Sequence, residues 1–523
     1  MANDLIIQPP VSRADSVRAR LAALAWKEGL SAFITNGVPF SFSSGRVLAD
    51  GIAHLVDALA QDADDITVME LGAGIGYLSS FCLDTLASQF SDTYEKSRFV
   101  VTDGEKTLVR DAASRGVLDR HTSRARFAVS DLRDHDSILS QHPRMLILSY
   151  LIDATLPEHG LQRDDGFYVA RIQTVIQDDV SVCDGGVWPP RVLDAVAIVA
   201  LLTDRFESIA PELGRKIAPF VEESWSWEVE ATPKAQGEML NSRRETVHNL
   251  CVLLSSMPDE SMAVVTDFGY VGPGEISPSE MMTEYGLCAF WAVFFTEIQE
   301  IARTSGFETF LLAGDEGETH TLAIYKGEYP DRMHEAFTAG FDGMVSDRPR
   351  YVLYNLEEDA GLPEIHEALE KIEETMAEAD VNSYGNLSRF AHLLLQFGDV
   401  GRALIYANRC VEHYPEVAAP EMTILGSDAG GRGDLASAEA LFLQAIDVAA
   451  GYANAHLGLS GVYKARGDWD RYFISIKEYL RSADCDVVEV MKGVASTLKG
   501  TELDAASVEA EEWLEEYGSS GLR

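Results

Sequence analysis

Cysteine is scarce in this chain of 523 residues, and it forms no functional pattern. The six cysteines are spread along the sequence without a C-x-x-C pair and without the dense spacing of a disulfide scaffold. They are Cys82, Cys183, Cys251, Cys288, Cys410 and Cys485. This distribution excludes a small disulfide-stapled protein and predicts reduced thiols, as in the cytoplasm.

Long apolar runs and metal-binding patterns are also missing. No stretch of about 18 apolar residues occurs, and the start, MANDLIIQPPVSRADSVRAR, lacks the apolar core of a signal peptide. The twelve histidines form neither an H-x-x-x-H pair nor a cluster with cysteine at zinc spacing. We therefore expect a cytoplasmic protein that binds no membrane and no metal ion.

Positive charge is in short supply. The chain has 42 lysines and arginines against 84 aspartates and glutamates, a net charge of −42. Each contact with a phosphate backbone would add repulsion, so nucleic acid is excluded as a partner. The acidity favours solubility and could attract cationic peptides, but it can equally have no specific function. With 46% apolar and 24% charged residues, the composition is that of a folded globular protein.

The first two thirds of the sequence have an α/β pattern. A chain of 523 residues corresponds to about two to four domains. Residues 1–60 have the apolar spacing of helices. From 61 to 330, β-rich runs such as ITVMEL, RFVVTD and RMLILS alternate with helical segments, which predicts a mostly parallel sheet covered by helices on both faces. An irregular stretch near 181–260 predicts an insertion into this domain.

The last third is expected to be helical. Residues 331–384 form an acidic connector with one apolar stripe that would pack on a neighbour. The stripe consists of Ile365, Leu369, Ile372 and Met376. Within 385–485, Gly-Asp recurs at positions 398, 433 and 467, spaced by 35 and 34 residues. This pattern resembles the tetratricopeptide repeat family, although a generic array of helical hairpins could have a similar period. Residues 486–523 are predicted to form a helical tail.

The strongest functional motif is a glycine loop after a β-rich run, VMELGAGIGYL at 68–78. Glycines let the backbone approach a ligand, whose polar groups then meet free N–H groups at the helix start. A dinucleotide fingerprint would need glycine where Tyr77 stands, and the Walker lysine is absent. An acidic residue before the loop suits a positively charged ligand better than a pyrophosphate. The ligand that fits is S-adenosylmethionine, and the predicted contacts are Glu70, Gly72, Ala73 and Gly74.

Acidic residues follow the next strands at the same predicted sheet edge. RFVVTD ends in Asp103, whose carboxylate can accept both ribose hydroxyls, and ARFAVSD ends in Asp131, which is placed to accept from the adenine amino group. Gly104 and Ser149, at the ends of neighbouring strands, complete the predicted cofactor site. Each acid alone could be a helix cap or a solvated group, but together they favour this cofactor.

From about residue 35 to 328 the sequence resembles class I S-adenosylmethionine-dependent methyltransferases of the MidA-like branch, the family of the mitochondrial complex I assembly methyltransferase. The matching pieces, in the family's order, are ELGAGIG, LILSYLIDATLP with GFYVARI, WSWEVEATPKA and VVTDFGYVGPGE. The resemblance implies an α/β Rossmann-like methyltransferase domain with a mostly parallel seven-stranded sheet, joined here to an all-α tetratricopeptide-repeat domain.

The sequence departs from the family pattern at residues that belong to the substrate site of the family. The family usually has Asn-Glu where this chain has Ser149-Tyr150, and its later histidine and aspartate correspond roughly to Ala292 and Phe294. Whether these departures abolish arginine methylation, the activity known in the mitochondrial member, is therefore left open by the sequence. The resemblance implies that the cofactor site is retained and the substrate site is not.

Methyl transfer requires an acceptor atom held in line with the methyl group and a nearby group that takes its proton. Tyr150 and Asp153 follow the fourth predicted strand and are placed for this, and Asp267 in VVTDFGY is a further candidate. Tyr150 could equally pack in the core, and Asp153 could cap the following helix.

The sequence therefore predicts a methyltransferase that acts on a protein or peptide. Stacked helix pairs form a concave groove suited to an extended peptide, so the repeats would recruit substrate or a partner, or form a homodimer. The alternatives are a small-molecule or natural-product methyltransferase, and a non-catalytic scaffold that retains the fold. Because the acidic connector separates the two regions, we also expect separate cores, with residues 1–335 binding the cofactor alone.

Overall fold

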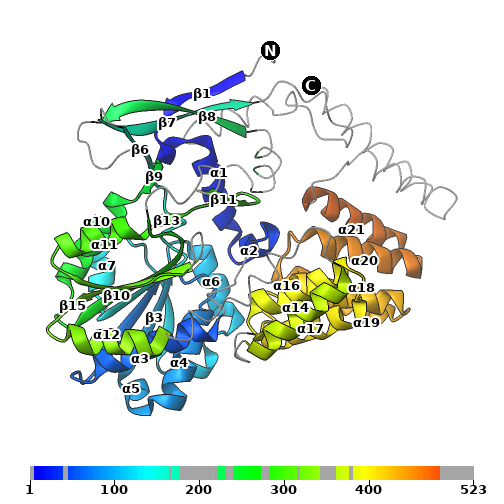
Figure 1. Cartoon of the computed structure of the whole chain (residues 1–523). Helices are drawn as coiled ribbons and strands as arrows, with labels where there is room; N and C mark the ends of the chain where they lie inside the picture. The colour runs from blue at the N-terminus through cyan, green and yellow to red at the C-terminus, as the bar shows by residue number, and fades with distance from the viewer. Residues whose placement is uncertain are drawn as a thin grey trace.

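The computed structural model shows an α/β region with an all-helical region beside it (Figure 1). The described residues are 5–38, 45–163, 166–176, 211, 214, 218, 221–230, 239–272, 282–314, 319–341, 361–375 and 381–482. The predicted tail 486–523 and most of the predicted insertion between 181 and 220 lie outside these residues.

A mostly parallel sheet forms the centre of the α/β region. Its strands lie in the order β14, β15, β10, β5, β2, β3, β4, and the short β13 pairs with the end of β10. The pairs from β10 to β4 are parallel, whereas β15 runs antiparallel to both β10 and β14. This order confirms the predicted Rossmann-like fold. The strands are β2 Ile66–Leu71, β3 Ser97–Asp103, β4 Ala125–Val129, β5 Met145–Ser149, β10 Ser261–Tyr270, β13 Val293–Phe294, β14 Glu308–Leu312 and β15 Thr319–Lys326.

The strand order reverses at β2, which lies between β3 and β5. Leu71 at its end pairs with Thr102 of β3 and with Leu148 of β5. The chain therefore leaves β2 towards one edge of the sheet and returns at β5 to build the other. At such a reversal a crevice opens beyond the carboxyl ends of the strands, and ligands of doubly wound folds bind there.

Helices cover both faces of this sheet. Alternate residues of a strand point to opposite faces, so Val68 of β2 belongs to one apolar core and Met69 to the other. The helices on the Val68 face are α3 (Arg46–Ala60), α4 (Tyr77–Gln89), α6 (Lys106–Arg115) and α12 (Pro330–Phe341). Those on the Met69 face are α7 (His135–Leu139), α10 (Arg244–Ser256) and α11 (Phe295–Thr304). The short α5 (Ser91–Lys96) follows α4.

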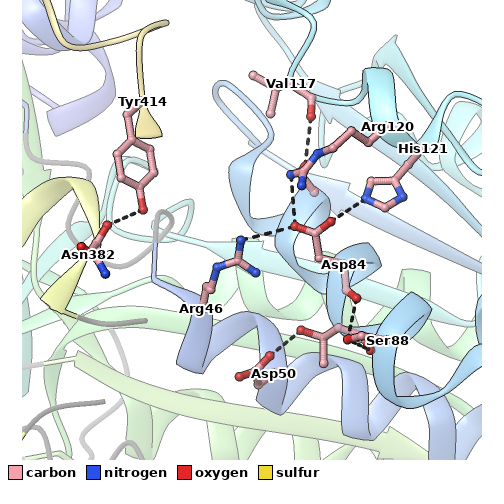
Figure 2. A network of polar contacts seen from close by, with 11 residues as sticks. Arg46, Asp50, Asp84, Ser88, Val117, Arg120, His121, Asn382 and Tyr414 are labelled. Atoms are coloured by element: carbon pink, nitrogen blue, oxygen red, sulfur yellow. Dashed lines mark hydrogen bonds and ion pairs between the residues drawn. The ribbon is translucent and has the colours of Figure 1, made fainter. Parts of the chain in front are cut away.

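Polar contacts fix α4, the helix that follows the glycine loop (Figure 2). Asp84 of α4 accepts a hydrogen bond from Arg120 at 3.1 Å, lies 3.1 Å from Nε2 of His121 and pairs with Arg46 of α3 at 3.5 Å. Arg120 and His121 belong to the 3₁₀ helix η3 (Asp119–His121). The helix that leads away from the ligand crevice is therefore held from two sides.

A second sheet is built from segments that are distant in the sequence. Its strands are β1 (Leu5–Val11), β6 (Glu158–Arg163), β7 (Gly166–Ile176), β8 (Val221–Glu230) and β9 (Met239–Ser242). Here the structure differs from the predicted helical segment 1–60, because β1 pairs with β7 at the edge of the sheet. Pro9 and Pro10 disfavour a helix and are tolerated in an edge strand.

The other elements described in the N-terminal segment are helical, and several of them lie at the cavity. It consists of η1 (Arg13–Asp15), α1 (Val17–Ala25), η2 (Trp26–Glu28), α2 (Ser31–Thr35) and α3. A separate hairpin of β11 (Met282–Tyr285) and β12 (Cys288–Trp291) packs against α1 through an apolar cluster that contains Leu21, Leu24 and Phe290.

Where the structure describes it, the all-helical region comprises α14 and three helical hairpins, in agreement with the predicted all-α region. Its helices are α14 (Leu362–Thr375), α16 (Tyr384–Gln396), α17 (Val400–His413), α18 (Ala419–Gly431), α19 (Leu435–Val448), α20 (Ala453–Arg466) and α21 (Trp469–Ser482). The recurring Gly-Asp dipeptide lies at the turn inside each hairpin, which explains its spacing of 35 and 34 residues. Each glycine has a left-handed φ of 73° to 84° at the turn, and the aspartate after it caps the next helix, as Asp399 does by accepting from the N–H of Arg402.

The two regions share one apolar core, contrary to the separate cores expected from the acidic connector. The cluster that contains Leu55 of α3 and Phe341 of α12 continues into Leu369 of α14, Phe390 of α16 and Tyr414 after α17. Ile365, Leu369 and Ile372 of the predicted stripe are buried in it, whereas Met376 lies outside the described residues. The apolar stripe of this acidic helix is therefore part of the shared core.

Candidate active site

A cavity of about 1020 Å³ opens at the carboxyl ends of β2, β3, β4 and β5. Its other walls come from α1, η2, α2, the first turns of α10 and the β11–β12 hairpin. Pockets for one small ligand usually enclose about 300–1,000 Å³, so this cavity can hold a cofactor together with an acceptor group. All predicted site residues except Asp267 line it, namely Glu70, Gly72, Ala73, Gly74, Asp103, Gly104, Asp131, Ser149, Tyr150 and Asp153.

The glycine loop has the backbone that the motif predicts. Gly72 and Gly74 have φ values of +70° and +55°, a left-handed conformation that side chains disfavour. A Cβ atom on Gly72 would lie 2.7 Å from Leu151, and one on Gly74 would lie 3.2 Å from Phe33. These two positions therefore require glycine. Without side chains, the backbone of the loop stays accessible to a ligand. In this respect the residues fit S-adenosylmethionine.

Two carboxyl groups, one buried and one partly buried, stand beside the loop. Glu70 is buried and accepts a hydrogen bond from the hydroxyl of Ser79, while burial raises its pKa to about 7. Asp103 accepts from the N–H of Gly74 at 3.4 Å and from the N–H of Glu105 at 3.0 Å. Burial also raises the pKa of Asp103. Asp103 thus lies against the loop, where its carboxylate would accept hydrogen bonds from the ribose hydroxyls.

Asp131 lies next to Asp103 but has a partner that the sequence analysis missed. Its Oδ2 is 3.5 Å from the position of a Cβ on Gly104, at the end of β3. The guanidinium of Arg133 donates to both carboxylate oxygens, at 2.9 and 2.7 Å, and these hydrogen bonds lower the pKa of Asp131. The two residues are two positions apart in one loop. Asp131 lines the cavity, and its contact with adenine stays a prediction.

Tyr150 has a strained backbone at the end of β5. Its φ is +52°, which is rare for a bulky residue and is found most often at functional sites. The backbone N–H of Tyr150 donates to the carbonyl of Thr266 at 2.9 Å, and its hydroxyl lies 2.9 Å from that of Thr319. These contacts fix the side chain at the cavity wall.

A buried cluster of two acids and one arginine lies under the loop that follows Tyr150. Asp153 is 2% exposed and lines the cavity, and its Oδ1 has no hydrogen-bond partner among the described residues. Burial raises the pKa of Asp153 to about 7, although Arg243 opposes this shift. A buried carboxylate oxygen without a donor is costly, so a ligand hydroxyl or N–H is a favourable partner for it.

Asp267 occupies a different position from the one its predicted catalytic role requires. It is fully buried, does not line the cavity, and accepts from the N–H groups of Ile152 and Asp153, both at 3.0 Å. Burial, reinforced by Asp153, raises the pKa of Asp267 well above its usual value. Its position is that of a group that holds the loop of Asp153.

Arg243 is the main site residue that sequence reasoning missed. Its guanidinium donates to the carbonyl oxygens of Trp291, at 2.6 Å, and Ala292, at 3.1 Å, and lies 3.5 Å from that of Asp153. It therefore ties the Asp153 loop to β12. Arg243 lies 90 residues from Asp153 in a polar stretch, so no local signal identified it.

Several aromatic side chains form one wall of the cavity. Trp26 packs edge to face on Phe33 and on Phe290, with ring centroids 5.2 and 6.3 Å apart. Phe33 faces Gly74, and Phe290 precedes Trp291, whose backbone N–H donates to the carbonyl of Asp153 at 3.0 Å. This aromatic wall therefore extends from the cofactor loop to Asp153, where an acceptor would lie.

Among known protein families, residues 47–284 match the one described as "Putative S-adenosyl-L-methionine-dependent methyltransferase". The match supports a methyltransferase of this cofactor class for the α/β region and agrees with the cofactor predicted from the sequence. The MidA-like and tetratricopeptide assignments stay predictions. No curated protein matches the chain.

Several solved structures resemble parts of this chain. A COG1565 superfamily member from Burkholderia thailandensis bound to S-adenosyl-homocysteine is 12% identical, with a TM-score of 0.38, and covers 61% of this chain and 88% of its own. An O-methyltransferase family protein from the same organism is 12% identical, with a TM-score of 0.30, over 61% and 65%. MamA protein is 19% identical, with a TM-score of 0.25, over 29% and 80%.

Among the described residues, no helix combines the length and the apolar character needed to cross a bilayer. In the same part of the chain, no group of three or more histidine, cysteine, aspartate or glutamate side chains has a metal-binding arrangement.

Proposed function

We propose that this protein is an S-adenosylmethionine-dependent methyltransferase. The observation that carries the proposal is a single cavity that joins the glycine loop and Asp103 to the buried carboxyl of Asp153, whose Oδ1 has no hydrogen-bond partner among the described residues. The first part fits the cofactor, and the second is a group that can take a proton from an acceptor. The family match over 47–284 agrees with the first part.

The residues of the cavity would hold the cofactor along the strand ends. Asp103 would accept the ribose hydroxyls, Asp131 would lie at the adenine, and the acidic Glu70 would favour the positive charge of the cofactor. When bound, S-adenosylmethionine supplies a methyl group on a sulfonium, and the electron pair of the broken C–S bond stays on the sulfur.

Asp153 would act as the general base. A carboxylate with a pKa near the working pH can accept a proton from a hydroxyl or nitrogen acceptor while that atom forms its new bond to carbon. Tyr150, fixed by Thr319, would orient the acceptor, and Asp267 with Arg243 would hold the loop that carries Asp153. Exclusion of water by the aromatic wall would strengthen these interactions.

Binding of S-adenosylhomocysteine tests the cofactor site. We expect the full chain to bind it in calorimetry and Gly74→Leu to lose binding, because the new side chain would enter the cavity. Gly398→Leu is the matched control, since Gly398 also has a left-handed φ, +84°, and a Cβ atom added there would meet nothing within 4 Å. Absence of heat for the folded wild-type chain at millimolar ligand would contradict the proposed function.

We further propose that the acceptor is a protein or peptide and that the helical region recruits it. Support comes from stacked helical hairpins, which suit extended peptides, and from their contact with the cavity wall at Tyr77. A lysate incubated with this protein and methyl-labelled cofactor should then carry label in its protein fraction. Gly74→Leu gives the background. Label confined to the low-mass fraction would show a small-molecule acceptor, and no label above background would favour a scaffold.

A further inference from the structure

The helical region reaches the cavity wall at Tyr77, the first residue of α4. Tyr77 lines the cavity directly after the glycine loop, and its hydroxyl donates to Oε2 of Glu416 at 2.6 Å. Glu416 lies in the turn between α17 and α18. In the same turn, Tyr414 meets the ring of Tyr77 edge to face, with centroids 5.3 Å apart. Two side chains of the helical region thus hold one residue of the wall.

The contact between Tyr77 and Glu416 is a charge-assisted hydrogen bond. Burial and the neighbouring carboxylate raise the pKa of Tyr77 well above its usual value. The phenol therefore stays protonated and acts as the hydrogen-bond donor. On its other side the ring of Tyr77 stacks on Phe81, at 5.8 Å between centroids. Because α4 is itself fixed through Asp84 (Figure 2), movement of the 414–418 turn would act on Tyr77 and the glycine loop.

A second part of the wall is anchored in the helical region through α2. Phe33 of this helix lines the cavity and faces Gly74. The next residue, Ile34, is buried among apolar side chains of α18, α19 and α20. They include Ala419, Met422, Ala445, Val448 and Ala455. Neighbouring residues of one short helix therefore contact the cofactor loop and the helical region.

We propose that the helical region completes the cofactor site, with Glu416 and Tyr414 as positioning residues for Tyr77. The inference rests on the proposed methyltransferase function and assigns a means of regulating it. Coupling of this kind is reciprocal: a partner that shifts the 414–418 turn changes cofactor affinity, and bound cofactor changes the mobility of that turn.

A double-mutant cycle tests the contact with S-adenosylhomocysteine as the probe. Tyr77→Phe and Glu416→Ala should each weaken its binding about tenfold in calorimetry, and the double variant should be no weaker than either alone, because both remove the same hydrogen bond. Glu416→Gln retains an acceptor oxygen and should recover part of the affinity. A role in stability alone would lower the melting temperature of the free proteins and leave the affinity unchanged.

Asp447→Asn is the matched control. Asp447 also joins the two regions, through an ion pair with Arg115 at 3.0 Å, but neither residue lines the cavity. We expect this variant to bind the probe with the affinity of the wild type. Equal loss in Asp447→Asn and Glu416→Ala would overturn the inference, and so would purely additive losses in the cycle.

Hydrogen exchange gives a readout that requires no variant. Saturating S-adenosylhomocysteine should slow exchange in the turn 414–418 as well as in the loop 72–76. Protection of the loop with unchanged exchange in the turn would overturn the coupling while leaving the proposed function intact. Lack of binding by the wild type would instead remove the function on which the inference rests.

Discussion

A fragment that ends at Phe341 should fail to fold into a stable cofactor-binding domain. The apolar core around α3, α4 and α12 continues into α14, α16 and α17. The truncation removes large side chains buried in it, among them Leu369, Phe390 and Tyr414. Each such side chain contributes about 1.5–3 kcal/mol when buried. Loss of several is comparable with the whole stability of a domain, about 5–15 kcal/mol.

Size-exclusion chromatography and thermal unfolding check this expectation. The fragment 1–341 should aggregate or expose apolar surface to a fluorescent dye, and co-expression with a second fragment, 361–523, should restore a folded complex. A monomeric fragment that melts cooperatively and binds S-adenosylhomocysteine as tightly as the full chain would instead support the separate cores expected from the acidic connector.

The sequence was sufficient wherever the determining interactions are local. The glycine loop, the acids at the strand ends and the Gly-Asp period all follow from backbone conformations of a few neighbouring residues. Gly74 requires a left-handed φ, and Asp399 caps the helix that begins at the next residue. The alternation of β-rich and helical segments then made the mostly parallel sheet predictable, and the Gly-Asp period made the helical region predictable.

Contacts between distant segments could not be predicted in this way. Glu416 lies 339 residues from Tyr77, and β1 pairs with β7 although more than 150 residues separate them. The burial of Asp267 behind the loop of Asp153 depends on the parallel pairing of β10 with β5. A carboxylate at a strand end and one directed into the core look alike in the sequence, so the two acids received the same predicted role.

Replacing Asp153 by asparagine should distinguish the role of Asp153 from that of Asp267. The variant should turn over about 100-fold more slowly or worse, since it removes the general base from the cavity. In the wild type only the ionised carboxylate accepts a proton. Because burial raises the pKa of Asp153 to about 7, kcat should rise as the pH increases through about 7 and level off above it. This dependence should be absent in Asp153→Asn.

Asp267→Asn is the matched comparison, because it changes the same functional group within one buried cluster. The asparagine keeps an oxygen that can accept from the N–H groups of Ile152 and Asp153, so the loop should stay in place. We expect a loss in kcat of less than about tenfold and a preserved rise near pH 7, because the base is intact. Cofactor binding, measured by calorimetry, should be unchanged in both variants. If Asp267→Asn were the slower variant and Asp153→Asn kept the pH dependence, the proton acceptor would be Asp267, and Asp153 would have to move aside to expose it.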